Sequence, residues 1–438
     1  MGAAVFALYG LVFGALTIRH VSFALLAIIC MFAFEQWGAL HIVAVAENGT
    51  LVNLCIIVLA AIAWFRLPPG TSFEFLLYPN RLLLMLLMFY AMASTLWSPT
   101  DADATTRFMD SVHYNIAGLL IAPLLVMTSR DITRVLDSVN IVGGLLVILF
   151  AYVPTFEGRS MVTAYNLEEM ISLPLTIGDF AGWVMLISIM RMRARLWSVL
   201  WSLLVFGSAL FLITKTGSRG QLIFGLAALL ICLPAKWKNF SVNKVLVYLL
   251  LGLLAAAAFA IVTQTENTLS SRMQSEYTDS ATQTRVEMAT ALLDVWVEGD
   301  LMTLIFGLGS SASWSPDIVG FYPHVIPLEI LGELGFLGFI LFSLVVMSLF
   351  LKAYSGKQKR ELGNQELTDF SALFACFVFA LLISCKQGTL IYSMHLMMYA
   401  ALAEKSFVLG TNKGRRQFAR KSFLRKSMNM RRRRASEA

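Results

Sequence analysis

His324 and Arg285 are the residues of this chain whose types and positions most favour catalysis beside a membrane. His324 directly precedes an apolar stretch, so its imidazole is expected at the boundary between water and lipid. With an ordinary pKa of about 6.5 it is mostly neutral and can accept a proton. Thr284 and Glu287 flank Arg285 with the spacing of a capping box, which predicts a helix from there to about Gly299. An arginine at a helix N-terminus suits a diphosphate, because the backbone N–H groups and the guanidinium fork both favour phosphate oxygens.

Four further residues at this boundary are candidates for supporting roles. Arg219 closes a short turn between two apolar stretches, where it either meets an anion or anchors a helix end at the lipid headgroups. Lys215, in the same turn, has the same alternatives. Glu329 and Glu333 are four residues apart and share one helix face, so one of them could orient the imidazole of His324, or both could be solvated. His324 could instead be a structural histidine, and Arg285 a solvated surface arginine.

The composition places these residues in a membrane protein. Hydrophobic residues make up 58% of the chain and charged residues 14%, whereas soluble domains carry roughly 25% charge. Long apolar runs without strand alternation favour the all-α class over a barrel. Because a span needs about 20 apolar residues, we predict about 12 transmembrane helices (12 or 13), at residues 3–18, 21–46, 51–65, 81–97, 112–127, 135–154, 171–190, 196–214, 220–234, 245–262, 323–351, 370–386 and 388–404.

A polar segment of 59 residues, 264–322, interrupts this pattern with eight carboxylates, two arginines and no lysine. Most other Lys and Arg fall in alternate loops, which the positive-inside rule assigns to the cytoplasm together with the C-terminal tail. The polar segment is therefore expected on the far side. The predicted division is an N-terminal transmembrane helix bundle (1–262), a long far-side loop with a short helix (263–322), C-terminal transmembrane helices (323–404) and a basic cytoplasmic tail (405–438).

The basic tail explains the formal net charge of +7 without a nucleic-acid partner. Runs such as Arg431–Arg434 directly after a last span favour contact with anionic membrane lipid. We therefore expect no nucleic-acid binding.

The sequence lacks the motifs that are typical of metal, nucleotide and cofactor sites. The five cysteines lie in apolar stretches without CxxC spacing, and the five histidines are scattered. The long loop has no DxD cluster, and the turn at 215–220 lacks the glycine spacing of a P-loop. We expect no metal site, no nucleotide site and no cofactor.

Three groups of residues, in their order and spacing, resemble the signature of the O-antigen ligase and O-antigen polymerase superfamily: Gly307-Leu-Gly309, then His324 and Leu328, then Gly332-Glu333-Leu334-Gly335 with Leu337-Gly338. Ser218-Arg219-Gly220 and Thr284-Arg285 are similar to the two arginine positions of that family. The resemblance covers about residues 205–345. Val325 stands where the family often has asparagine after the histidine, and Pro327 where an aromatic residue is common.

The resemblance implies a metal-independent, inverting glycosyltransferase at the periplasmic face of a bacterial inner membrane. Its donor would be a glycan on undecaprenyl diphosphate, and its acceptor a glycan or a lipid A-core sugar. Arg219 and Arg285 would bind the diphosphate, and His324 would take the proton from the acceptor hydroxyl. The segment 263–322 would be a long periplasmic loop, with the C-terminus in the cytoplasm.

Two alternatives stay open at this point. A ligase and a polymerase would share the donor and the arginines, and no motif distinguishes their acceptors. A secondary transporter or channel is the alternative from another class. Its candidate groups within apolar runs would be Glu35 and Asp179, but no internal repeat accompanies them.

Overall fold

The computed structural model describes residues 2–48, 51–67, 77–157, 160–161, 174–193, 195–236, 275–355 and 361–411. Within these ranges the chain is helical apart from its loops and one antiparallel pair of two-residue strands, β1 (Phe156–Glu157) and β2 (Ser160–Met161). The expected helical class is thus confirmed. The predicted span at 245–262 and the tail beyond residue 411 lie outside the described residues.

The helices before residue 237 follow most of the predicted apolar runs, several of them in pieces. They are α1 (Gly2–Arg19), α2 (Phe23–Ile29), α3 (Met31–His41), α4 (Val43–Glu47), α5 (Leu51–Phe65), α6 (Pro79–Ser94), η2 (Thr95–Trp97), α7 (Asp101–Ile116), η3 (Ala117–Ile121), α8 (Ala122–Leu124), α9 (Ser129–Ser138), η4 (Val139–Gly143), α10 (Gly144–Tyr152), α11 (Pro174–Arg191), α12 (Leu196–Lys215), α13 (Arg219–Cys232) and η5 (Leu233–Lys236).

The later helices include the polar segment and the last apolar runs. They are α16 (Ser275–Val297), α17 (Leu301–Phe306), η6 (Ala312–Trp314), α18 (Ile326–Tyr354), α20 (Asn364–Ser384), η7 (Leu390–Tyr392) and α21 (Met394–Gly410).

The count of about 12 spans is not confirmed. Among the described residues, six helical stretches are long and apolar enough to cross a membrane, and a seventh qualifies if α2 and α3, bent by 62°, form one span. Two more apolar helices, at 3–19 and 51–65, are shorter. The predicted single span at 21–46 is therefore a bent structure. The chain is a multi-pass membrane protein, with six or seven candidate spans among its described residues.

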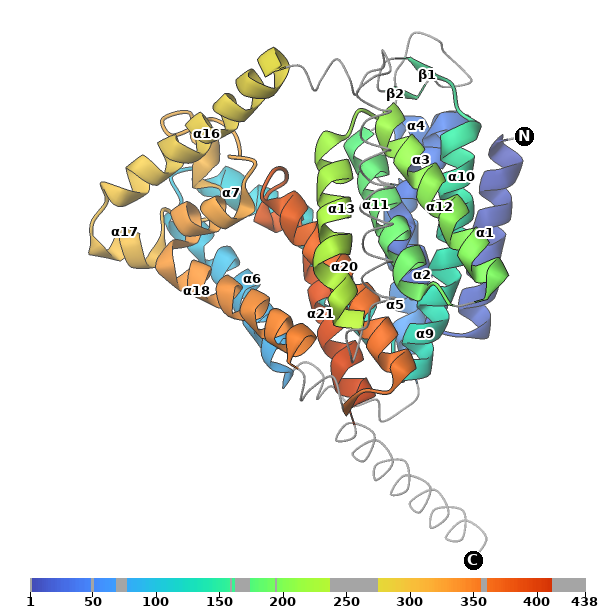
Figure 1. Ribbon diagram of the computed structural model, residues 1–438. Coiled ribbons are helices and arrows are strands. Elements are labelled where there is room, and N and C mark those ends of the chain that lie inside the picture. The colour runs from blue at the N-terminus through green and yellow to red at the C-terminus, as the bar shows by residue number, and fades with distance from the viewer. Residues whose placement is uncertain are drawn as a thin grey trace, which may run out of the picture.

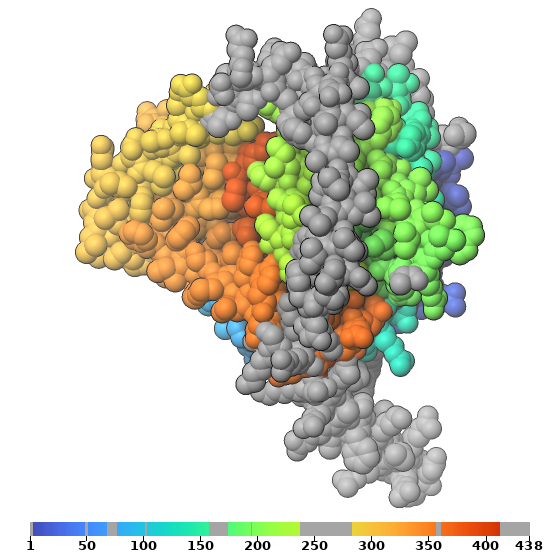
Figure 2. Space-filling view, in the orientation of Figure 1, coloured from blue at the N-terminus to red at the C-terminus, as the bar shows by residue number. Residues whose placement is uncertain are grey.

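Helix α20 forms the centre of the bundle. It packs against α21, α13 and α11, and most of its side chains are buried inside the protein. One group of helices packs together on one side of α20 and α21 and consists of α6, α16, α17 and α18. The other group, α9 to α13, lies on the opposite side (Figure 1). In the space-filling view, a strip of the red C-terminal part of the chain lies between the yellow and orange surface of α16 and α18 and the yellow-green surface of α13 (Figure 2).

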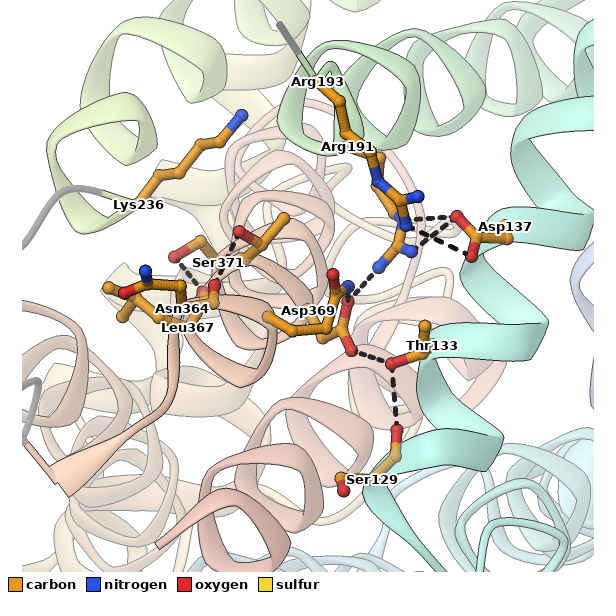
Figure 3. Close-up of polar contacts among 12 residues, drawn as sticks. Ser129, Thr133, Asp137, Arg191, Arg193, Lys236, Asn364, Leu367, Asp369 and Ser371 are labelled. Carbon is orange, nitrogen blue, oxygen red and sulfur yellow. Dashed lines mark hydrogen bonds and ion pairs between the residues drawn. The ribbon is translucent and has the colours of Figure 1, made fainter. Parts of the chain in front are cut away.

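A buried network of charges joins α9, α11 and α20 (Figure 3). The guanidinium of Arg191 in α11 forms ion pairs with Asp369 in α20 and with Asp137, which lies 2.5 Å away in α9. Thr133, also in α9, donates a hydrogen bond to Asp369. The side chains of Arg191 and Asp369 are only 1% and 2% exposed, so their charges neutralise each other away from water.

A second buried carboxylate connects the two groups of helices. Glu404 in α21 accepts hydrogen bonds from the backbone N–H groups of Asn80 and Arg81 at the start of α6, at 3.1 Å each. The ammonium of Lys352 at the end of α18 lies 3.0 Å from the same carboxylate. Glu404 therefore caps α6 from a distant helix and ties α6 and α18 to α21.

We predict that Asp369→Ala destabilises the protein by about 3 kcal/mol, because it leaves the buried guanidinium of Arg191 with one partly exposed partner. Thermal unfolding of the detergent-solubilised protein measures this. Arg193→Ala is the control, since the side chain of Arg193 is 51% exposed and its 3.6 Å ion pair should contribute less than about 1 kcal/mol. Equal unfolding temperatures for both variants would show that the network does not hold the helices.

Candidate functional site

Arg285 lies inside a long helix and not at its start. The sequence predicted a helix beginning near Thr284, but α16 begins at Ser275 and ends at Val297, close to the predicted end. The capping-box prediction is wrong because the helix continues through these residues, and Glu287 instead accepts a hydrogen bond from the side chain of Gln283 at 2.9 Å. The backbone N–H groups at residue 285 are therefore not available for an anion, and only the guanidinium is.

The packing of α16 turns Arg285 towards the start of α18. Ala289, Leu292 and Trp296 form the buried stripe of α16, at helical spacing. Leu292 lies against Gly332, and the ring of Trp296 is 5.2 Å from that of Phe336, both in α18. Arg285 continues this stripe one turn before Ala289, which brings its charge within electrostatic range of the loop that precedes α18.

His324 and Arg285 are brought together by this arrangement. Burial lowers the pKa of His324 below its ordinary value, and the nearby positive charge of Arg285 lowers it further. Arg285 also opposes the rise in the pKa of Tyr322 that burial and Glu329 cause. A half-buried imidazole whose pKa is lowered is neutral near pH 7 and can therefore accept a proton.

Aromatic rings surround His324. Its ring centroid lies 4.2 Å from that of Tyr322 and 5.6 Å from that of Phe321, and Trp314 lies 4.9 Å from Phe321. We call Trp314, Phe321, Tyr322 and His324 the aromatic cluster. His324 has a φ of 61°, which a non-glycine residue adopts only when its surroundings hold it there.

The motif glycines fix the loop that carries this cluster. Helix α18 is broken at Gly335, whose φ of 62° is open to glycine at little cost. The carbonyls of Gly332 and Glu333 next to the break accept hydrogen bonds from the backbone N–H groups of Leu308 and Gly309, at 3.0 and 2.8 Å. A Cβ atom on Gly335 would lie 2.4 Å from the carbonyl oxygen of Ile305. The break and the loop therefore require each other.

Glu333 organises the next part of the same loop. Its carboxylate accepts hydrogen bonds from the backbone N–H of Ser311 at 2.7 Å and from the N–H and hydroxyl of Ser313 at 3.1 and 2.7 Å. Ser313 directly precedes Trp314. Glu333 thus positions the aromatic cluster through the backbone.

Glu329 has a different set of partners. Its carboxylate accepts hydrogen bonds from the hydroxyl of Thr389 and from the N–H of Leu390, the latter at 3.1 Å. Within the described part of the chain, neither Glu329 nor Glu333 is hydrogen-bonded to His324. Direct orientation of the imidazole by one of them stays a prediction.

Arg219 is the first residue of α13. The side chain of Lys386 crosses the adjacent Gly220, with its Nζ 2.3 Å from where a Cβ would be. Gln387 and Gln221 both donate hydrogen bonds to Asp179 in α11, at 3.2 and 3.0 Å. The structure thus gathers Arg219 and Lys386 next to a buried polar group, while the described contacts do not join Arg219 directly to His324.

Lys215 is directed towards other elements. Its ammonium donates a hydrogen bond to the carbonyl of Ala151 at 3.1 Å and lies 5.0 and 4.8 Å from the rings of Phe156 and Phe211. These contacts agree with the structural alternative, and a supporting role in the site stays a prediction.

Sequence reasoning missed the aromatic cluster and Lys386. The only signal for the cluster was the density of aromatic residues between Trp314 and Tyr322 ahead of the histidine. No sequence motif marks Lys386. Across the ranges that the structure describes, no three His, Cys, Asp or Glu side chains gather as metal ligands do.

We predict that Gly335→Ala lowers the stability of the protein by at least about 2 kcal/mol, because alanine is strained at this φ and its Cβ meets the backbone of Ile305. The readouts are thermal unfolding and hydrogen exchange at residues 307–315, which should speed up. Gly14→Ala is the matched control, since its Cβ meets no atom within 4 Å. Slow exchange retained in the Gly335 variant would contradict this account of the loop.

The chain was compared with known proteins in three ways. A search of curated proteins found no match. Among solved structures, a chain from "Structural coordination of polymerization and crosslinking by a peptidoglycan synthase complex" is similar at 14% identity and a TM-score of 0.40, over 75% of this chain and 95% of that one. That likeness is too distant to inform the activity. The family model described as O-antigen ligase matches residues 202–343, which include Arg219, Arg285, His324 and the motif glycines. Residues 202–343 therefore match the O-antigen ligase family, as the sequence motifs predicted.

Proposed function

We propose that this protein is a membrane glycosyltransferase that moves a glycan from undecaprenyl diphosphate to a sugar hydroxyl. It would act as an O-antigen ligase or as a polysaccharide polymerase in lipopolysaccharide or exopolysaccharide biosynthesis. The observation that carries the proposal is the placement of Arg285 beside the half-buried imidazole of His324, within the segment that matches the family. The acceptor would be a glycan or a lipid A-core sugar.

In the proposed reaction, the neutral imidazole of His324 accepts the proton of the acceptor hydroxyl. The hydroxyl oxygen attacks the anomeric carbon of the donor, and the bond from this carbon to the diphosphate oxygen breaks. The electron pair of that bond leaves with the diphosphate. Attack opposite to the leaving group inverts the anomeric centre.

Arg285 and Arg219 would hold the diphosphate and stabilise the charge that develops as it leaves. Guanidinium groups bind phosphate oxygens in pairs and keep their charge at any physiological pH. Such fixed positive groups stabilise a leaving anion where water is excluded, so the arginines would serve in place of a metal ion. Lys386 beside Gly220 adds a second positive side chain next to Arg219.

The proposed site would face the periplasm of a bacterial inner membrane, with the C-terminus in the cytoplasm. Helices α20 and α21 support this orientation. Thr389, between them, bonds to Glu329 near His324, whereas Arg191 and Lys352 bond near their opposite ends, at Asp369 and Glu404. Those two cations belong to the set that the positive-inside rule assigns to the cytoplasm.

We predict that His324→Ala lowers the transfer rate by at least about 10²-fold, the typical contribution of a general base. Transfer is measured with a purified undecaprenyl-diphosphate-linked glycan and the protein in nanodiscs. His20→Gln is the control, because the side chain of His20 is 43% exposed and pairs with Asp131 away from the site. Transfer at the wild-type rate by correctly inserted His324→Ala protein would remove the histidine from the mechanism.

We also predict a shift in the pH dependence of transfer in Arg285→Gln. Because burial and Arg285 both lower the pKa of His324, the wild-type base stays neutral below its ordinary pKa, and activity falls only at lower pH. Loss of the guanidinium raises that pKa, so the acid limb of the kcat profile should move to higher pH, besides any loss of donor affinity. The profile of Arg193→Gln should match the wild type. An unmoved acid limb in Arg285→Gln would argue against His324 as the titrating base.

A further inference from the structure

We propose that Arg107 is a further anion-binding residue of this site, and that its guanidinium, lying on the ring of Trp314, binds a phosphate or carboxylate group of a substrate. The inference rests on the proposed function. It adds a residue of α7, which lies outside the segment matched by the family.

Arg107 has an unusual environment for a charged side chain. The central carbon of its guanidinium, Cζ, lies 3.8 Å from the centroid of the Trp314 ring. Its Nε is buried and has no hydrogen-bond partner among the described residues. Asp103 and Asp110 lie one turn away on the same helix, but neither forms an ion pair with Arg107 in the described part of the chain. A half-buried guanidinium without a carboxylate partner leaves N–H donors that an external anion can bind.

The stacked geometry prepares the guanidinium for an anion. An arginine on an indole face is held by cation–π attraction, which fixes the plane of the guanidinium. The N–H groups at its edge then point in set directions and can form the paired hydrogen bonds that phosphate and carboxylate accept. A lysine at the same place would keep the charge but lose both the flat stacking and the paired donors.

Trp314 connects Arg107 to the proposed base. Its ring lies 5.6 Å from that of Tyr322, which in turn lies 4.2 Å from His324. The backbone that carries Trp314 is fixed by Glu333 through Ser311 and Ser313. Arg107 therefore rests on a positioned member of the aromatic cluster.

Helix α7, which carries Arg107, also contacts the connection between α20 and α21. The hydroxyl of Tyr392 in η7 lies within electrostatic range of both Arg107 and Asp110. Helix α7 is joined to η7, since Asn115 donates a hydrogen bond to the carbonyl of Ile391 at 2.6 Å. The same connection from α20 to α21 contains Lys386 beside Gly220. Arg107 is thus linked to His324 through Trp314 and Tyr322, and its helix is linked to the connection between α20 and α21.

The test measures binding by the full-length protein in nanodiscs, with two anionic probes. One is undecaprenyl diphosphate, and the other is a tetrasaccharide containing glucuronic acid. We expect Arg107→Gln to weaken binding of at least one probe by about tenfold or more, as loss of charge-assisted hydrogen bonds does. Weakening of the first probe assigns Arg107 to the donor, and weakening of the tetrasaccharide alone assigns it to an acidic acceptor.

Further variants separate anion binding from a structural role. Arg107→Lys should recover only part of the affinity, and Trp314→Leu should weaken binding with an effect that does not add to that of Arg107→Gln. Arg130→Gln, an exposed arginine at the start of α9, should bind as the wild type does. Thermal unfolding is followed in parallel, and an affinity loss at an unchanged unfolding temperature supports the inference.

The outcomes distinguish this inference from the function on which it rests. His324→Ala should bind both probes normally while transfer is lost. Wild-type affinity of Arg107→Gln for both probes would overturn the inference alone. A wild-type protein that neither binds undecaprenyl diphosphate nor transfers glycan would overturn the proposed function, and the inference with it.

Discussion

The break of α18 at Gly335 is the constraint on which the site depends. A continuous helix would use the carbonyls of Gly332 and Glu333 internally, whereas the break leaves them to accept hydrogen bonds from Leu308 and Gly309. These bonds hold the loop on the helix and let Glu333 reach Ser311 and Ser313. The aromatic cluster and His324 follow from there. Glycine is required on both sides, because a Cβ on Gly307 would lie 2.2 Å from the carbonyl oxygen of Glu333.

The two buried glutamates of α18 hold different segments around the site. Glu333 holds the loop before His324, and Glu329 holds the connection between α20 and α21 through Thr389 and Leu390. One helix turn thereby links two segments far apart in sequence. The sequence placed both carboxylates correctly on one helix face, but their partners are backbone N–H groups and hydroxyls of other segments, which no local pattern reveals.

Local patterns predicted the elements better than their contacts. Apolar runs located most helices within a few residues, since burial and length are both visible in the sequence. The capping-box spacing at Thr284 misled because it is a local signal, and α16 gains more from the buried stripe of Ala289, Leu292 and Trp296 than from a cap. Gly332, Gly335 and Gly338 recur every third residue, as in closely packed helices. Their spacing therefore did not indicate the break at Gly335. Arg107 was invisible as a site residue because its contact with Trp314 spans about half of the chain.

The hydrogen bonds at the break involve backbone atoms on both sides. Side chains between Gly309 and Gly332 therefore contribute little to joining the two ends of this loop. The ends of the loop can therefore stay fixed when its exposed residues, such as Pro316 and Asp317, are replaced, as long as the glycines remain. Such a closed loop allows evolution to reshape the surface around the imidazole without shifting the helices underneath it.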